Sequence, residues 1–152
     1  MITTLLRRHK RIALDTSVLI YHLEGHPHYS EQTSAFLDAI QGGSCQGVVS
    51  DLSLFELLVV PLRKEQPGVA DEYEILLTNF PNLTLAPLTR DVILTAAALR
   101  AKHGLKTPDA LIVATALEQK ATLLVTNDRA WRRVPGIEIY CLSAAVSPGN
   151  GQ

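Results

Sequence analysis

Four carboxylates in this sequence have the chemistry and the positions to form one metal-binding pocket: Asp15, Glu56, Asp109 and Asp128. Asp15 directly follows an apolar run and Asp128 comes shortly after another, while the other two acids lie on helical patterns beside apolar residues. Acids that share a pocket repel one another, and a divalent cation relieves that repulsion. Because every expected ligand atom is an oxygen, the set suits Mg²⁺ or Mn²⁺ better than Zn²⁺, which prefers His or Cys.

Each acid also has a purely structural interpretation. Asp15 and Asp128 are both suited to capping a helix N-terminus. Asp109 falls in a first helical turn, where a negative charge is favoured by the helix dipole. Glu56 is the hardest to explain in this way, because an unpaired carboxylate on an apolar helix face is costly, although an exposed edge would tolerate it. The residues alone leave these alternatives open.

The elements that would position these acids alternate along the chain. The sequence predicts strands at 12–14, 47–50, 83–85, 122–125 and 137–140. It predicts one helix directly after Thr16 and others at 29–40, 52–62, 69–80, 89–103, 107–117 and 128–133. This alternation predicts βαβ crossovers and a parallel sheet covered by helices on both faces. Ligands bind at the carboxyl edge of such sheets, which is where Asp15 and Asp128 would lie.

Local capping signals fix where some of these helices begin. Asp51 and Ser53 are candidate N-caps for the helix at 52–62. Thr107 is a candidate cap for the helix that Pro108 opens.

Size and charge restrict the possible classes of protein. The 152 residues predict a single domain over 1–146, followed by a Pro/Gly/Asn-rich tail at 147–152 that we expect to be disordered. With 14 Lys+Arg against 15 Asp+Glu, the net charge of −1 gives no overall nucleic-acid signature, so a polyanionic partner would have to meet a local basic patch. The basic cluster at 7–11 is interpreted as a solvated arm.

Other residue types predict no further site. Cys45 and Cys141 are far apart and form no C-x-x-C motif, so we expect buried, reduced thiols. His22, His26 and His28 surround a Gly-His-Pro break and are interpreted as loop residues rather than metal ligands. No apolar run is long enough to span a membrane, and no signal peptide is recognised, so a cytoplasmic protein is expected.

Four segments of the chain resemble a known family. They read LDTSVLI at 14–20, SLFELL at 53–58, HGLKTPDALI at 103–112 and TND at 126–128. Their order and spacing resemble the PIN-domain nucleases, and most closely the VapC-type toxin ribonucleases of toxin–antitoxin systems. Each segment alone is weakly specific, but all four occur in order on the expected elements.

The resemblance implies a three-layer α/β/α domain with a five-stranded parallel sheet in the order 3-2-1-4-5. It implies Asp15, Glu56, Asp109 and Asp128 as the metal-binding and catalytic acids of an Mg²⁺- or Mn²⁺-dependent ribonuclease. Cleavage would leave a 5′-phosphate and a 3′-hydroxyl. The resemblance also implies a small antitoxin partner and a homodimer.

The chain departs from the family pattern at two positions. Ser17 stands where the family often has Asn, and Ala130 stands where many relatives place a further acid, which would weaken a second metal site. The alternative interpretation is a catalytically degenerate PIN-like module that binds nucleic acid or protein. A phosphotransferase with a strand-end Asp is disfavoured, because Ser17 replaces the second Asp of the Asp-x-Asp motif of haloacid-dehalogenase-like phosphatases.

Overall fold

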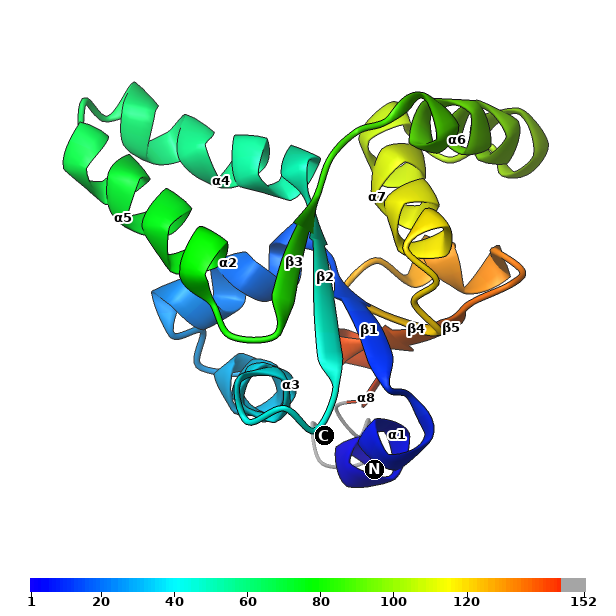
Figure 1. Cartoon of the computed structure of the whole chain (residues 1–152), viewed down its shortest axis with the longest axis horizontal. Coiled ribbons are helices and arrows are strands. Elements are labelled where there is room, and N and C mark those ends of the chain that lie inside the picture. Colours follow the sequence, from blue (N-terminus) through cyan, green and yellow to red (C-terminus); the bar gives the residue numbers. More distant parts are fainter. Residues whose placement is uncertain (146–152) are drawn as a thin grey trace.

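One five-stranded parallel sheet forms the centre of the protein (Figure 1). The computed structural model describes residues 1–145, and for residues 132, 133 and 145 it describes the backbone alone. The strands are β1 (Arg11–Leu14), β2 (Gln46–Ser50), β3 (Leu83–Ala86), β4 (Leu123–Thr126) and β5 (Glu138–Cys141). Their order, β3-β2-β1-β4-β5, confirms the order that the resemblance implied. The predicted tail at 147–152 lies outside the described residues.

The central strand β1 is buried on both faces of the sheet, which explains its uninterrupted apolar sequence. Ala13 is in register with Val48 of β2 and Leu124 of β4. Ile12 and Leu14 point into one core cluster and Ala13 into the other, as the two-residue period of a strand requires. The two clusters hold the helical layers against the sheet.

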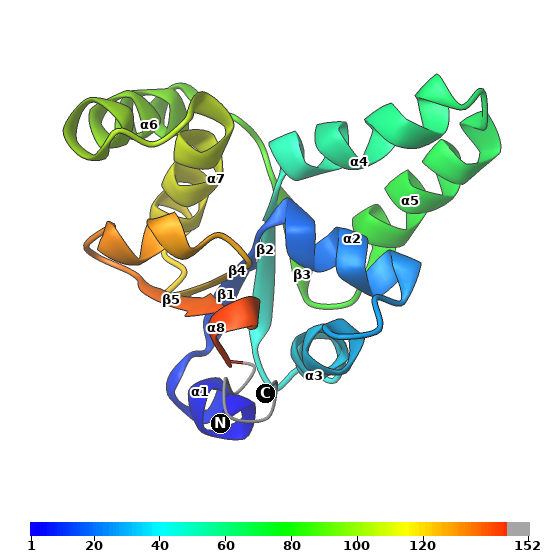
Figure 2. The same ribbon diagram turned by 180° about the vertical axis from the view of Figure 1, so that it is seen from behind.

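Helices cover both faces of the sheet (Figure 2). One face carries α1 (Ile2–Arg8), α2 (Thr16–Glu24), α3 (Ser30–Gln41) and the short α8 (Leu142–Ala145). The other carries α6 (Arg90–His103), α7 (Thr107–Glu118) and the 3₁₀ segment η1 (Arg129–Arg133). The hairpin of α4 (Asp51–Arg63) and α5 (Pro67–Asn79) extends away from the sheet. None of the helices in residues 1–145 is long and apolar enough to cross a membrane.

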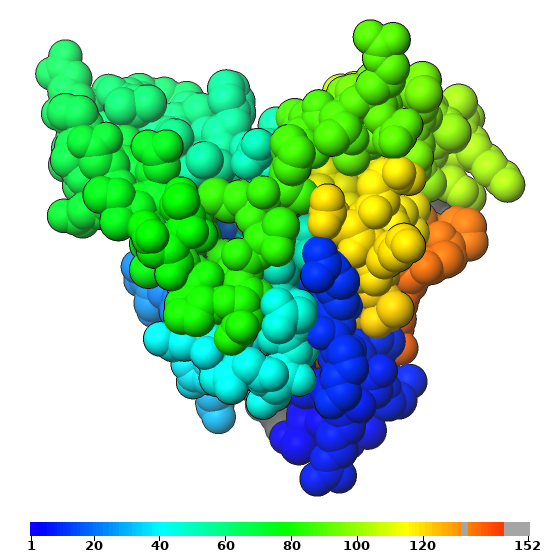
Figure 3. All heavy atoms as spheres, viewed as in Figure 1, coloured from blue at the N-terminus to red at the C-terminus, as the bar shows by residue number. Residues whose placement is uncertain are grey.

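The space-filling view shows a notch between the α4–α5 hairpin and the α6–α7 pair (Figure 3). The carboxyl ends of the strands lie beneath this notch, and β1 and β4 are neighbours there. Asp15 and Asp128, which follow β1 and β4, therefore lie at this edge of the sheet, as expected where the strand order reverses.

Three local predictions were wrong. The basic cluster at 7–11, interpreted as a solvated arm, instead comprises the end of α1, the buried His9 and the first residue of β1, and α1 itself packs on the core through Leu5. The N-cap of α4 is Ser50, whose hydroxyl accepts from the backbone N–H of Leu52, and neither Asp51 nor Ser53 has this role. Thr107 is the first residue of α7 and not its cap. In contrast, the buried free thiols of Cys45 and Cys141 confirm the prediction for the cysteines.

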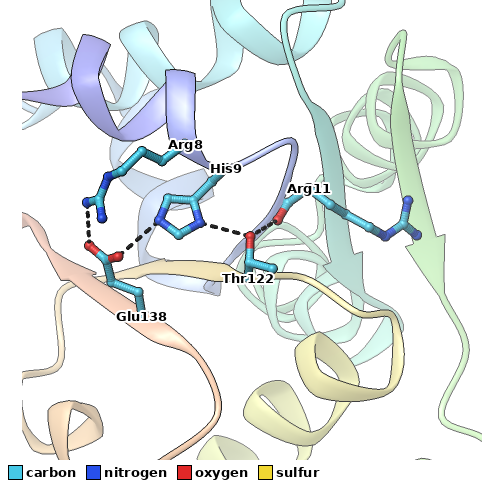
Figure 4. A network of polar contacts seen from close by, with 5 residues as sticks. All are labelled: Arg8, His9, Arg11, Thr122 and Glu138. Carbon is cyan, nitrogen blue, oxygen red and sulfur yellow. Dashed lines mark hydrogen bonds and ion pairs between the residues drawn. The ribbon is translucent and has the colours of Figure 1, made fainter.

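A polar network attaches α1 to the amino edge of the sheet (Figure 4). We call it the His9 network; its members are Arg8, His9, Arg11, Thr122 and Glu138. The buried His9 ring contacts the Thr122 hydroxyl through Nδ1 at 2.8 Å and the Glu138 carboxylate through Nε2 at 3.0 Å. Arg8 donates to the other Glu138 oxygen at 3.2 Å. Every charged group of the network therefore has a partner of opposite charge or a hydrogen-bond partner close by.

Candidate functional site

Asp15 is held rigidly at the end of β1. It is only 8% exposed, and both carboxylate oxygens accept hydrogen bonds. The backbone N–H of Thr16 donates to Oδ1 at 2.7 Å, while the hydroxyls of Ser17 and Thr126 donate to Oδ2 at 3.0 and 2.8 Å. Asp15 also caps α2. The two interpretations of this residue are therefore compatible, because capping fixes the carboxylate at the carboxyl edge.

Glu56 is connected to the first turn of α2 by a chain of hydroxyl groups. Thr16 Oγ1 donates to Glu56 Oε1 at 2.7 Å and lies 2.7 Å from Ser53 Oγ. Since a carboxylate accepts, the single Thr16 proton is used on Glu56, and Ser53 donates to Thr16. This chain turns the half-buried Glu56 from its apolar neighbours toward the end of β1.

Asp128 follows β4 and begins η1. Its Oδ1 accepts from the backbone N–H of Ala130 at 2.9 Å, which is the capping role that the sequence left open. Its own backbone N–H donates to Thr126 Oγ1 at 3.0 Å. Thr126 thus contacts both strand-end acids, since its hydroxyl donates to Asp15 as well.

Asp109 lies in the first turn of α7 and interacts electrostatically with all three other acids. Burial raises its pKa, and the charges of Asp128 and Glu56 raise it further, while the Trp131 indole and the Lys106 ammonium oppose this rise. The pKa of Asp15 is raised to about 6, chiefly by burial and to a smaller extent by the charge of Asp109. Burial disfavours the charged form of a carboxyl group, and like charges nearby add to the rise in its pKa.

We call Asp15, Glu56, Asp109 and Asp128 the acidic pocket. The ion pairs among the described side chains both involve Glu138 at the opposite edge of the sheet, so none of them neutralises this pocket. As they stand, no three His, Cys, Asp or Glu side chains within residues 1–145 are close enough together to hold one metal ion. The four acids share one electrostatic environment without forming a preassembled ligand shell.

The donor set fits a hard divalent cation. Every candidate ligand is a carboxylate oxygen, and hydroxyl groups already orient two of the acids. Mg²⁺ is usually held by only one or two protein carboxylates, with water and substrate phosphate completing its octahedron. A site of separated acids is therefore suited to Mg²⁺ or Mn²⁺, and His and Cys side chains, which Zn²⁺ prefers, are absent from the pocket as described.

The two departures from the family pattern have different consequences. The Ser17 hydroxyl donates to Asp15 and so orients this carboxylate. Ala130 supplies only its backbone N–H, to Asp128, and adds no oxygen ligand. The pocket therefore contains four acids and lacks the fifth that many relatives have.

Sequence reasoning missed the hydroxyl residues that hold the acids. Thr16, Ser53 and Thr126 are all buried. Thr16 and Thr126 each donate to an acid of the pocket, and Ser53 donates to Thr16. A usable signal was present, because each of these hydroxyl residues lies one to three positions from one of the acids. The interpretation of the three histidines as loop residues is confirmed for His26 and His28 and was wrong for His22, which lies in the last turn of α2. The His26 ring stacks on Tyr29 and is tilted against Tyr21.

A parallel 3-2-1-4-5 sheet with acids at its carboxyl edge defines the class of this protein. Residues 12–137 match the model of the PIN domain family, and the chain belongs to this family. PIN domains are in general nucleases. Helix α1 lies outside the matched residues.

The fold is also that of several solved toxin–antitoxin structures. A chain of a toxin–antitoxin complex from Klebsiella pneumoniae has a TM-score of 0.66 and 22% identity, over 86% of this chain and 97% of that one. A chain of VapBC2 from Rickettsia felis, bound to a promoter DNA fragment, has a TM-score of 0.69 and 20% identity, over 86% and 98%. A chain of FitAcB from Neisseria gonorrhoeae has a TM-score of 0.62 and 22% identity, over 87% and 98%. Among curated proteins, none matches this chain.

Proposed function

We propose that this protein is a divalent-metal-dependent ribonuclease of the VapC type, the toxin of a toxin–antitoxin pair. The observation that carries the proposal is the acidic pocket, in which burial and neighbouring acids raise the pKa of Asp15 and Asp109 while no ion pair among the described side chains compensates the charge. An acidic pocket of this kind is costly unless a cation occupies it. Membership of the PIN domain family supports nuclease chemistry at this position.

In this proposal Asp15 and Asp109 hold the principal Mg²⁺ or Mn²⁺, and Glu56 and Asp128 complete its shell or contact a second ion. The ion would supply an activated water and positive charge for the attacked phosphodiester. The residues of the chain fix the geometry: three hydrogen bonds hold the Asp15 carboxylate, and Thr16 orients Glu56. By family resemblance the products carry a 5′-phosphate and a 3′-hydroxyl.

Two basic side chains near the pocket are suited to the phosphate backbone of an RNA. Lys106 is exposed directly before α7 and acts electrostatically on Asp109. Arg129 is exposed at the start of η1, where its Nε lies 3.4 Å from Ser143 Oγ. Because the net charge of the chain is −1, such local cations have to supply the attraction for RNA.

The decisive experiment is cleavage of total RNA by the purified protein with Mg²⁺ or Mn²⁺, with excess EDTA, and with the Asp15→Asn variant. We expect fragments only from the metal-loaded wild type, and sequencing of their ends identifies the preferred RNA. Circular dichroism controls for folding of the variant. Cleavage at the wild-type rate in EDTA, or by a folded Asp15→Asn protein, contradicts the proposal.

A degenerate PIN module that only binds a partner is the second candidate. One observation that favours it is Ala130, which stands in place of an acid. Another is the separation of the acids, because no three of them lie close enough together among residues 1–145 to hold one metal ion. Mn²⁺ titration separates the two candidates, because a ligand that binds the folded state raises its stability. A melting temperature that does not respond to Mn²⁺ would favour the degenerate module.

The proposal includes an antitoxin partner. Solved chains of similar fold come from toxin–antitoxin complexes, and α4 and α5 leave large apolar side chains exposed here: Phe55, Val60, Leu62, Ile75 and Leu76. A cavity of about 70 Å³ beside them is lined by Glu56 and apolar residues such as Ile20 and Leu57. An antitoxin segment docked there would cover Glu56 and inhibit cleavage.

A homodimer is also part of the proposal. Helix α6 buries Val92, Ala96 and Leu99 in the core but leaves Ile93 and Leu94 46% and 62% exposed, which supports a second contact surface. Light scattering of wild type and Leu94→Asp tests it, and a monomeric wild type contradicts it. We expect the protein to act in the cytoplasm, where the thiols of Cys45 and Cys141 stay reduced.

A further inference from the structure

Trp131 is the only tryptophan of the chain and connects two elements of the acidic pocket. It lies in η1, the segment that Asp128 caps, and its side chain is 1% exposed. The ring belongs to the same core cluster as Ala110 and Val113 of α7, the helix that carries Asp109. The ring therefore lies in a core that both acid-bearing segments share.

The polar end of this ring is not satisfied by a well-formed hydrogen bond. Trp131 Nε1 is buried and has no partner that meets hydrogen-bond geometry within the described residues. Leaving a buried donor unpaired is destabilising, so a phenylalanine would fill such a space with less penalty. A tryptophan is favoured in a core where its N–H can reach an acceptor.

The Asp109 carboxylate is the acceptor that this N–H faces. The indole is the strongest of the influences that favour the charged form of Asp109, although burial outweighs it. The two groups are thus near each other, but the contact is longer or less well aligned than a hydrogen bond. A small rotation of the Asp109 side chain would correct this, whereas the buried ring has little freedom to move.

We propose that Trp131 is a positioning residue for Asp109: its indole N–H holds one carboxylate oxygen and leaves the other free for a divalent ion. The contact exists in the metal-free protein, and it would tighten into a hydrogen bond once a bound divalent ion fixed the orientation of the Asp109 carboxylate. The tightening of the contact on metal binding rests on the proposed function. Partners that hold a metal-ligating carboxylate in this way typically change metal affinity by about 10–100-fold.

The single indole N–H resonance of ¹⁵N-labelled protein tests the contact directly. In metal-free protein, Asp109→Asn should move this resonance upfield and speed its hydrogen exchange, whereas Glu138→Gln, at the far edge of the sheet, should leave it unchanged. Titration with Mg²⁺ should move the wild-type resonance downfield and slow its exchange. An indole resonance that does not respond to Asp109→Asn overturns the proposal.

The same experiment separates the proposal from the proposed function. If Asp109→Asn moves the indole resonance but Mg²⁺ has no effect on it or on the melting temperature, the contact is supported and metal binding is contradicted. If Mg²⁺ stabilises the protein while the resonance ignores both Mg²⁺ and Asp109→Asn, metal binding stands and the positioning role is overturned.

Substitution of Trp131 measures the size of the effect. β-(3-benzothienyl)alanine at position 131 keeps the shape of the ring and lacks the N–H, so the fold is preserved. We expect Mg²⁺ affinity, measured by calorimetry, to fall about 10-fold, with a lower kcat and an unchanged KM for RNA. Trp131→Phe should show the same loss of affinity together with lower stability.

A matched control separates positioning from packing. Phe36→Leu truncates a fully buried aromatic ring on the opposite face of the sheet and should lower stability without weakening Mg²⁺ binding. Wild-type Mg²⁺ affinity in the benzothienylalanine protein would show that the ring only fills space and would overturn the proposal.

Discussion

The acidic pocket and the His9 network lie at opposite edges of the same sheet and differ in how their charges are compensated. In the His9 network the one carboxylate, Glu138, meets both a guanidinium and an imidazole. In the acidic pocket four carboxylates meet mainly hydroxyl groups, backbone N–H groups and one another. A cluster that is complete within the chain stabilises the fold, whereas a cluster that lacks its counter-charge is poised to bind one.

The largest expected difference between the two clusters is in catalysis. Asp109→Asn should lower the rate of RNA cleavage by about 10³-fold, because a lost ion ligand removes several kcal/mol of stabilisation from the transition state. Glu138→Gln should cleave at the wild-type rate. Single-turnover cleavage of a defined RNA measures both, and an equal loss in the two variants would remove the functional distinction between the clusters.

The second difference is in how stability depends on pH without metal. Folding raises the pKa of Asp15 from 3.8 to about 6, so the folded state holds this proton more tightly than the unfolded state. This tighter binding of the proton contributes roughly 3 kcal/mol to the free energy of unfolding below pH 4, and the contribution is lost as the pH rises to about 7. The raised pKa of Asp109 acts in the same direction.

Urea denaturation in EDTA between pH 4 and pH 7 measures this dependence. Asp15→Asn should flatten it, Glu138→Gln should retain it, and Mn²⁺ at pH 7 should restore stability to the wild type. If the Asp15→Asn and wild-type profiles run parallel, burial of Asp15 carries no such penalty.

The hydroxyl groups of the two clusters should also behave differently. Thr16→Val removes the donor to Glu56 and should weaken Mn²⁺ binding and cleavage about 10-fold, as expected for a group that orients a metal ligand. Thr122→Val removes a contact of His9 and should lower stability by about 1 kcal/mol without altering either property. Calorimetry and thermal denaturation separate the two effects, and unchanged Mn²⁺ affinity in Thr16→Val would contradict this role.

The smallest effect is expected within the His9 network itself. Glu138→Gln leaves His9 and Arg8 without their carboxylate, which should lower stability by about 1 kcal/mol, since the pairs are partly exposed. Amide hydrogen exchange should quicken in α1 and remain unchanged in α7. Faster exchange across the whole chain would show that the network stabilises more than the attachment of α1.

The sheet and its acids were predictable from local patterns, but the groups that hold the acids were not. Asp15 and Asp128 follow apolar runs, and the parallel arrangement then places both at one edge. The shared use of Thr126 by these two acids depends on the register of β1 against β4, which joins residues 111 positions apart. No local pattern encodes that register.

The N-terminal helix was missed for a similar reason. Its seven residues are too few for a helical period to be recognised, and the arginines around Leu5 suggest a solvated segment. What fixes it to the domain is the contact between His9 and Glu138, 129 positions away. At α4 three neighbouring residues are suited to capping, and the end of β2 selects Ser50, which leaves Ser53 for the hydroxyl chain to Glu56.

The pairing of β1 with β4 has a consequence for the protein during its synthesis. Asp15 and Glu56 leave the ribosome long before Asp109 and Asp128, and the strand that closes the sheet beside β1 is among the last parts of the domain to be made. Domains fold as units once such distant segments can meet. A nascent chain shorter than 109 residues therefore carries only two of the four acids, and the acidic pocket is complete only after Asp128 has been made.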